Sequence, residues 1–94
     1  MTRAPDAIFL DRDGTVMEDA HYIQSPEQVR LIPGAAQAVK RINDAKVPVI
    51  VITNQSGIGR GIITLEDYEA VKNQFESLLA RVGAHIDASY YCPD

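Results

Sequence analysis

The stretch Ile8-Phe9-Leu10-Asp11-Arg12-Asp13-Gly14-Thr15 decides the fold of this chain. A short apolar run without polar alternation is typical of a strand that is buried on both faces of a parallel sheet. The run leads directly into two acidic residues and a glycine that permits a turn. Because residues i and i+2 of an extended chain point to the same side, Asp11 and Asp13 are expected to converge on one target. Two like charges repel each other, so we expect a cation between them, and Mg²⁺ prefers such oxygen ligands.

The composition is that of a small and mildly acidic domain. The chain has 94 residues, of which 46% are hydrophobic and 23% charged, and its net charge is −4. This balance argues against a nucleic-acid or membrane partner, which would require clustered Lys and Arg. We expect no membrane span and no signal peptide, because no apolar run is long enough. Cys92 is the single cysteine, which excludes an internal disulfide and favours a cytoplasmic location.

Hydrophobic periodicity predicts that strands and helices alternate along the chain. We expect strands at residues 7–11, 47–53 and 86–92, and helices from Pro33-Gly34 to Ala45 and from Thr64 to Val82. Thr64 is the expected N-cap of the second helix, with Asp67 three residues on as in a capping box, and Tyr68 belongs to the apolar stripe of that helix. Residues 16–33 are expected to be irregular, with a short helical turn near Pro26-Glu27-Gln28. The order strand, helix, strand, helix, strand predicts an α/β fold in which a parallel sheet lies between helices.

A second polar stretch follows the second predicted strand: Thr53-Asn54-Gln55-Ser56-Gly57-Ile58-Gly59-Arg60-Gly61. Ligands of parallel sheets bind beyond the carboxyl ends of the strands, so this loop is expected to face the Asp11–Asp13 turn. Thr53 offers a hydroxyl, Asn54 an amide, and the glycines offer exposed backbone N–H groups, all of which suit phosphate. One carboxylate could then attack phosphorus while the other transfers a proton.

A dinucleotide-binding loop is the competing interpretation of the three glycines. That loop requires Gly-x-Gly-x-x-Gly, whereas this sequence has Gly57-x-Gly59-x-Gly61. An acidic residue should also end the next strand, but Asp87 precedes most of it. Phosphoryl transfer is therefore favoured over dinucleotide binding.

The motif Asp11–Thr15, taken together with the loop Thr53–Gly61, resembles the haloacid dehalogenase superfamily of phosphatases. The resemblance covers the whole chain, including the helix start at Pro33-Gly34-Ala35 and the end at Tyr90-Tyr91-Cys92-Pro93. It implies a three-layer Rossmann-like fold, of which residues 1–94 would form the N-terminal βαβαβ portion of a single domain. It also implies Mg²⁺-dependent hydrolysis of a small sugar phosphate through an aspartyl-phosphate.

The resemblance further implies a role for each polar residue of the two loops. Asp11 would be the nucleophile, Asp13 would be the general acid and base, and the two would also hold Mg²⁺. Thr53 would bind the phosphoryl group that is transferred. Other contacts to phosphate or substrate would come from Arg12, Asp19, His21, Tyr22, Asn54, Gln55 and Ser56. From the sequence itself, Arg60 is either an exposed loop cation or a contact to a second phosphate of the substrate.

Three features of the family have no counterpart in this sequence. A later lysine that neutralises phosphate charge and a later acidic metal ligand would both fall beyond residue 94. The zinc loop of the resembled branch begins Cys-x-His, whereas Cys92 is followed by Pro93 and Asp94. Zn²⁺ binding at Cys92 is thus an expectation from resemblance alone. We expect the isolated chain to be part of a longer protein or a truncated product, with little or no phosphatase activity.

Two other classes of function remain open at this point. One is a phosphate- or metal-binding module without turnover, because the lysine is missing. The other is a phospho-acceptor like the response regulators, although their acidic cluster is arranged differently. Within the phosphatases, another small-molecule phosphate is an alternative substrate. Residues 14–33 are too few to form a cap domain, so an open site is expected between the two motifs.

Overall fold

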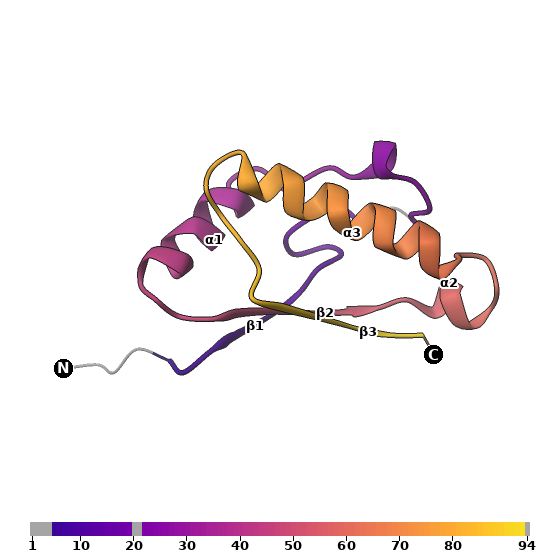
Figure 1. Cartoon of the computed structure of the whole chain (residues 1–94), viewed down its shortest axis with the longest axis horizontal. Helices are drawn as coiled ribbons and strands as arrows, with labels where there is room; N and C mark the ends of the chain where they lie inside the picture. Colours follow the sequence, from indigo (N-terminus) through magenta and orange to yellow (C-terminus); the bar gives the residue numbers. More distant parts are fainter. Residues whose placement is uncertain (1–4, 20–21, 94) are drawn as a thin grey trace.

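A computed structural model describes residues 5–19 and 22–93 of the chain. Its elements are, in chain order, β1 (Ile8–Asp11), η1 (Pro26–Gln28), α1 (Ala35–Asp44), β2 (Val49–Asn54), α2 (Ser56–Gly59), α3 (Leu65–Ala80) and β3 (Ala88–Cys92). The strands form one parallel sheet in the order β1-β2-β3 (Figure 1). The predicted α/β fold with a parallel sheet is confirmed, and each predicted long element is present within a few residues of its expected bounds.

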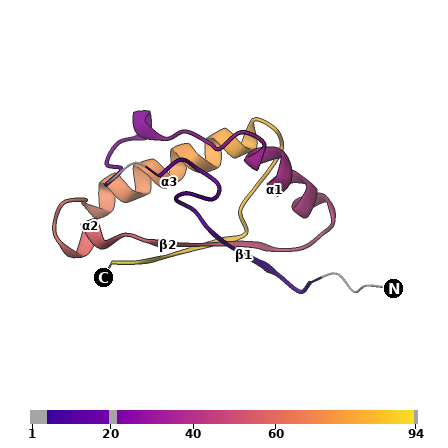
Figure 2. The same cartoon turned by 180° about the vertical axis from the view of Figure 1, so that it is seen from behind.

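Both long helices, α1 and α3, lie on the same face of the sheet (Figures 1 and 2). Each right-handed crossover here moves one strand further in the same direction, and this places successive helices on one side. The prediction that the sheet lies between helices is therefore wrong for the described residues. The opposite face exposes apolar side chains: Phe9 is 63% exposed, Ile52 46% and Tyr90 61%.

The core lies between the sheet and the two helices. Val49 and Val51 of β2 are fully buried against Phe75 and Leu79 of α3, which are 1% and 0% exposed. Alternation along β2 explains this arrangement, since residues i and i+2 of a strand face the same side. The helix face of the sheet is thus tightly packed, and it holds the carboxyl ends of the strands in place.

The helix α3 begins at a side-chain cap. The Thr64 hydroxyl accepts from the backbone N–H of Asp67 at 3.0 Å, and the Asp67 carboxylate accepts from the Thr64 N–H at 3.3 Å. This reciprocal pair confirms the predicted capping box, here with aspartate in the third position. The helix ends at Ala80, and Gly83 follows with a φ of 78°. Within the described residues, no helix is both long and apolar enough to cross a membrane.

The segment between β1 and α1 is more ordered than the sequence predicts. Met17 pairs with Leu31 in an antiparallel bridge, flanked by hydrogen bonds from Glu18 N to Arg30 O and from Ile32 N to Val16 O. The short helical turn η1 at Pro26–Gln28 is confirmed. Met17 is fully buried, so the segment that connects β1 to α1 packs against the core.

The two phenylalanines of the chain allow a direct test of this one-sided packing. Phe75→Ala should lower the free energy of unfolding by about 3–5 kcal/mol, because it leaves a cavity beneath α3. Phe9→Ala should change it by less than about 0.5 kcal/mol, because that ring is exposed. Urea denaturation followed by circular dichroism measures both values. An equally large loss for Phe9→Ala would show that the exposed face is covered in solution.

Candidate active site

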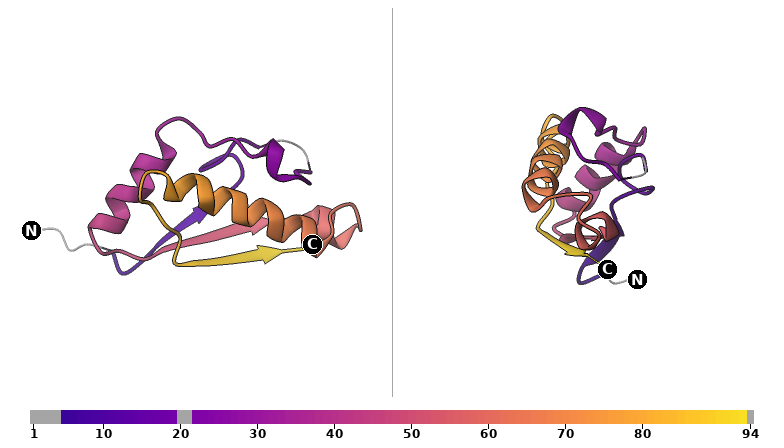
Figure 3. Two further views of the ribbon diagram at one scale, coloured as in Figure 1. Left: turned by 45° about the horizontal axis from the view of Figure 1, so that its top comes forward. Right: turned by 90° about the vertical axis from the view of Figure 1, so that its right-hand side faces the viewer.

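The carboxyl ends of β1 and β2 lie side by side at one edge of the sheet (Figure 3). The parallel register pairs Asp11 with Ile52, so the residues after Asp11 reach the level of the end of β2. This is the arrangement predicted from the sequence. It brings two loops that are 40 residues apart in the chain into direct contact.

Asp13 is the residue through which the two loops meet. Its Oδ2 accepts from the Thr53 hydroxyl at 3.3 Å and from the Gln55 amide at 3.1 Å, and Gln55 Nε2 also donates to Thr53 Oγ1 at 2.9 Å. Thr53 and Gln55 are buried, with 1% and 6% exposure, whereas the Asp13 side chain remains 20% exposed. Two buried side chains therefore hydrogen-bond to the Asp13 carboxylate, while part of the carboxylate faces solvent.

Arg12 supplies the remaining contacts of the Asp13 carboxylate. Its Nε donates to Asp13 Oδ1 at 2.9 Å, and its Nη2 donates to Oδ2 at 3.4 Å. The residue is only 2% exposed, and its guanidinium lies 5.8 Å from the centre of the Tyr68 ring. The guanidinium, predicted to contact phosphate, is buried against Asp13 and Tyr68, and a contact of Arg12 with phosphate stays a prediction.

Tyr68 of α3 joins the site to the core. Its ring lies 4.7 Å from that of Tyr91 on β3, and the residue is 4% exposed. Burial raises the pKa of the Tyr68 phenol, and the Arg12 guanidinium partly opposes this. The sequence places Tyr68 correctly in the apolar stripe of the helix but offers no sign that its ring lies beneath Arg12.

A small open cavity of about 160 Å³ adjoins Asp13. Five other residues predicted to bind substrate line it: Asp19, Tyr22, Asn54, Gln55 and Ser56. Ile23, Gly57 and Ile63 complete the lining and were not predicted. Gly57 is required by close packing, since a Cβ there would lie 2.7 Å from Ile63 Cδ1 and 2.9 Å from Tyr22 Cδ1.

Four of the residues predicted for catalysis or substrate binding lie outside this lining, namely Asp11, Arg12, Thr53 and Arg60. Asp11 is exposed at the end of β1, and its convergence with Asp13 on one ion stays a prediction. Arg60 is exposed beyond α2, and its Nη1 donates to the Tyr22 hydroxyl at 3.2 Å. The guanidinium of Arg60 is therefore adjacent to the cavity through Tyr22. His21 and Asp94 lie outside the described residues.

The glycine-rich loop does not present the open row of backbone N–H groups that the sequence suggests. Residues 56–59 form the short helix α2. The N–H of Gly59 bonds to Pro93 O, that of Arg60 to Ser56 O, and those of Ile62 and Ile63 to Gly57 O. These donors are satisfied by the chain itself. Side chains of the loop, rather than its later N–H groups, are therefore available to a ligand.

The oxygen ligands at the strand ends are of the type that Mg²⁺ prefers, but the described residues supply too few of them. The Asp11 carboxylate and the Asp13 backbone provide oxygen ligands, which hard cations prefer. Among the described residues, however, no three His, Cys, Asp or Glu side chains group closely enough to hold a metal ion. A further acidic ligand would have to come from outside them.

Zinc is not supported at Cys92. The residue is exposed and its thiol is free. A structural zinc site needs four closely placed ligands, and the part of the chain described here contains no such group around Cys92.

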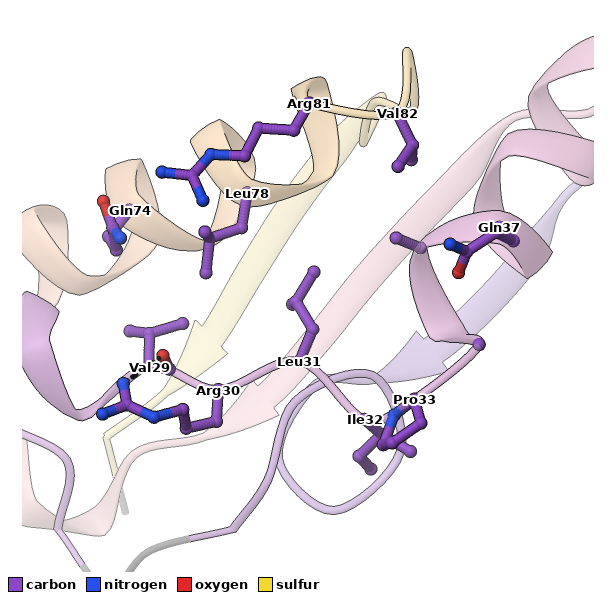
Figure 4. A pocket seen from close by; sticks show the side chains of 12 residues that line it. Val29, Arg30, Leu31, Ile32, Pro33, Gln37, Gln74, Leu78, Arg81 and Val82 are labelled. Carbon is purple, nitrogen blue, oxygen red and sulfur yellow. Dashed lines mark hydrogen bonds between the residues drawn. The ribbon is translucent and has the colours of Figure 1, made fainter.

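A larger cavity of about 590 Å³ lies on another part of the molecule (Figure 4). It is bounded by the segment 29–34 and the start of α1 on one side, and by Leu78, Arg81 and the end of α3 on the other. Its lining contains none of the predicted site residues. We place the candidate site at the smaller cavity, because carboxylate, hydroxyl and amide side chains from both loops converge there.

The fold and site define a parallel α/β protein with its polar groups at the carboxyl ends of β1 and β2. The family model for haloacid dehalogenase-like hydrolases matches residues 8–65. This chain belongs to that family, as the Asp11–Thr15 motif predicts.

Individual curated relatives that resemble this chain are named as phosphatases. A D-glycero-D-manno-heptose-1,7-bisphosphate 7-phosphatase of Thermosynechococcus vestitus is 44% identical over 89 residues, which cover 94% of this chain and 45% of the relative. A D-glycero-beta-D-manno-heptose-1,7-bisphosphate 7-phosphatase of Yersinia pestis is 37% identical over 93 residues, covering 99% and 50%. The chain thus spans about half the length of the curated relatives it matches.

The solved structures agree with these relatives. The crystal structure of D,D-heptose 1,7-bisphosphate phosphatase from Bordetella bronchiseptica, complexed with magnesium and phosphate, superposes with a TM-score of 0.89 at 36% identity. The match covers 95% of this chain and 50% of that one.

The raised pKa of Tyr68 predicts a loss of stability at alkaline pH. The folded state holds the phenolic proton more tightly than the unfolded chain, whose ordinary pKa is 10.0. The contribution of Tyr68 to the free energy of unfolding is thus complete below that pH and is lost as the pH rises through the folded pKa. Between about pH 9 and about pH 11, wild type should lose more stability than Tyr68→Phe. Urea denaturation at each pH measures this, and parallel pH profiles would contradict it.

Proposed function

We propose that this chain carries part of the active site of a phosphomonoesterase that acts on a sugar phosphate, of the D-glycero-D-manno-heptose 1,7-bisphosphate 7-phosphatase type. The contact of Asp13 with Thr53 and Gln55 carries this proposal, because it joins an acidic loop and a hydroxyl-bearing loop in one site. Residues 1–94 would be the N-terminal portion of one phosphatase domain. The enzyme would be cytoplasmic and would need neither nucleic acid nor membrane.

The first half of the reaction transfers the phosphoryl group to the protein. A carboxylate oxygen of Asp11 attacks phosphorus, and the bond from phosphorus to the sugar oxygen breaks. Asp13, protonated at this stage, donates its proton to the leaving oxygen, so that the sugar departs as a neutral alcohol. The exposure of Asp11 at the end of β1 supports this role, because its carboxylate is accessible to a substrate.

The second half returns Asp11 to its free form. Asp13, now a carboxylate, accepts a proton from a water molecule that attacks phosphorus. The bond from Asp11 to phosphorus breaks, and inorganic phosphate leaves. The Thr53 hydroxyl, which lies beside Asp13, would bind a phosphoryl oxygen in both halves.

Magnesium would be held by the Asp11 carboxylate and the Asp13 backbone carbonyl, with a further acidic ligand from beyond these residues. When bound, it neutralises charge on the phosphate oxygens. The relative from Bordetella bronchiseptica was crystallised with magnesium and phosphate, which supports this assignment.

The size and lining of the cavity suit a small hydroxylated substrate. Asp19, Asn54 and Ser56 supply hydrogen-bonding side chains to a space of about 160 Å³. Arg60, through its contact with Tyr22, provides a cation at the margin that suits a second phosphate. Histidinol phosphate or another small phosphate ester is the alternative substrate.

A phosphate- or metal-binding module without turnover is the second candidate function for the isolated chain. It is favoured by one observation, namely the lack of a third metal ligand among the described residues. On this basis we expect residues 1–94 alone to release phosphate slowly or not at all.

Phosphate release by the full-length gene product separates these functions. With Mg²⁺ and heptose 1,7-bisphosphate, wild type should turn over, and Asp11→Asn should lower kcat by at least about 1000-fold, because the nucleophile is lost. Histidinol phosphate serves as the competing substrate, and Asp44→Asn, an exposed carboxylate on α1, serves as the matched control. Equal release by wild type and Asp11→Asn would refute the role of Asp11. Faster release from histidinol phosphate would reassign the substrate.

A further inference from the structure

Arg12 is a buried cation to which the proposed reaction assigns no role. An arginine at 2% exposure is rare unless the charge is paired, because removing an ion from water is costly. Here the partner is Asp13, the residue that exchanges protons in the proposed reaction. The placement of this guanidinium therefore bears directly on the orientation of that carboxylate.

The contacts between the two residues restrict the carboxylate in more than one direction. Arg12 Nε donates to Oδ1 at 2.9 Å and Nη2 donates to Oδ2 at 3.4 Å, so the planar guanidinium contacts both oxygens. From the other side, Thr53 and Gln55 donate to Oδ2. Hydrogen bonds from Arg12 after β1, and from Thr53 and Gln55 at the end of β2, together restrict the χ angles of Asp13.

Arg12 is itself fixed at both its backbone and its side chain. Its carbonyl accepts hydrogen bonds from the N–H groups of Thr15, Val16 and Met17, at 3.4, 3.0 and 3.0 Å. Its guanidinium lies over the ring of Tyr68, a cation–π contact of 5.8 Å to the ring centre. Tyr68 in turn packs against Tyr91 at 4.7 Å. This series of contacts connects α3 and β3 to Asp13.

We propose that Arg12 is a positioning residue, which holds the Asp13 carboxylate in the orientation required for proton transfer and is supported from below by the Tyr68 ring. It does not bind substrate. This role rests on the proposed function, since the orientation of Asp13 affects the rate only if Asp13 exchanges protons with substrate and water.

Steady-state kinetics of the full-length gene product with Mg²⁺ and heptose 1,7-bisphosphate tests the role. Arg12→Met should lower kcat about 100-fold and leave KM within about twofold, because misorientation of Asp13 affects the transition state more than substrate binding. Arg12→Lys keeps the charge but loses the planar fork, so kcat should fall about 10-fold. Arg41→Met, which removes an exposed guanidinium on α1, is the matched control.

A second variant keeps the test decisive if Arg12→Met fails to fold. Tyr68→Leu removes the ring beneath Arg12 and leaves the Arg12–Asp13 pair in place, and it should lower kcat about 10-fold at constant KM. Thermal unfolding of each variant identifies any that are unfolded at the assay temperature. A raised KM with unchanged kcat in the folded Arg12 variants would overturn the positioning role and restore Arg12 as a phosphate ligand.

Nuclear magnetic resonance of the 94-residue chain tests the contact without turnover. In ¹⁵N-labelled protein, the Arg12 Nε–H should give a resolved signal that exchanges slowly with solvent. This signal should persist in Asp11→Asn and Tyr68→Phe and disappear in Asp13→Ala. A rapidly exchanging signal in wild type would overturn the proposal.

The two proposals fail in different ways. A full-length wild type without turnover overturns the proposed function and the positioning role together. An active wild type in which Arg12→Met keeps its kcat overturns the positioning role alone.

Discussion

The parallel pairing of β1 with β2 is the constraint on which the rest of the structure depends. It aligns Asp11 with Ile52, and Asp13 then contacts Thr53 and Gln55 beyond the paired residues. A shift of the register by one residue would turn the side chains of β2 to the opposite face and remove Thr53 from Asp13. The apolar packing of Val49 and Val51 under α3 holds this register. The polar contacts at the site are thus a consequence of core packing.

The second constraint is the buried charge of Arg12. Removing one partner of a buried ion pair costs about 3–5 kcal/mol, because the other charge is left unpaired, so loss of Asp13 should destabilise the fold through Arg12. The site and the core are therefore not independent: Asp13 contacts Arg12, Arg12 contacts Tyr68, and Tyr68 belongs to the buried face of α3. This coupling restricts the orientation of the carboxylate although its side chain is 20% exposed.

Much of this arrangement could be predicted from the sequence, because it follows from local patterns. The apolar runs predict β1 and β2, Thr64 and Asp67 predict the start of α3, and the parallel order predicts that the two loops meet. Other features depend on contacts between distant residues. The burial of Arg12 under Asp13 depends on Tyr68, which is 56 positions away, and the folding of the glycine loop into α2 depends on Pro93 and Cys92 as hydrogen-bond acceptors. The helices cover only one face of the sheet because both crossovers move in the same direction along the order β1-β2-β3, which the run of elements along the chain does not specify.

A crystal structure of the full-length gene product with Mg²⁺ and beryllium fluoride, which mimics a phosphoryl group on a carboxylate, tests the central claim most directly. We expect the fluoride complex on the Asp11 carboxylate, within hydrogen-bond distance of the Thr53 hydroxyl and beside Asp13. An anion bound elsewhere, such as in the cavity between α1 and α3, with the ends of β1 and β2 empty, would contradict it.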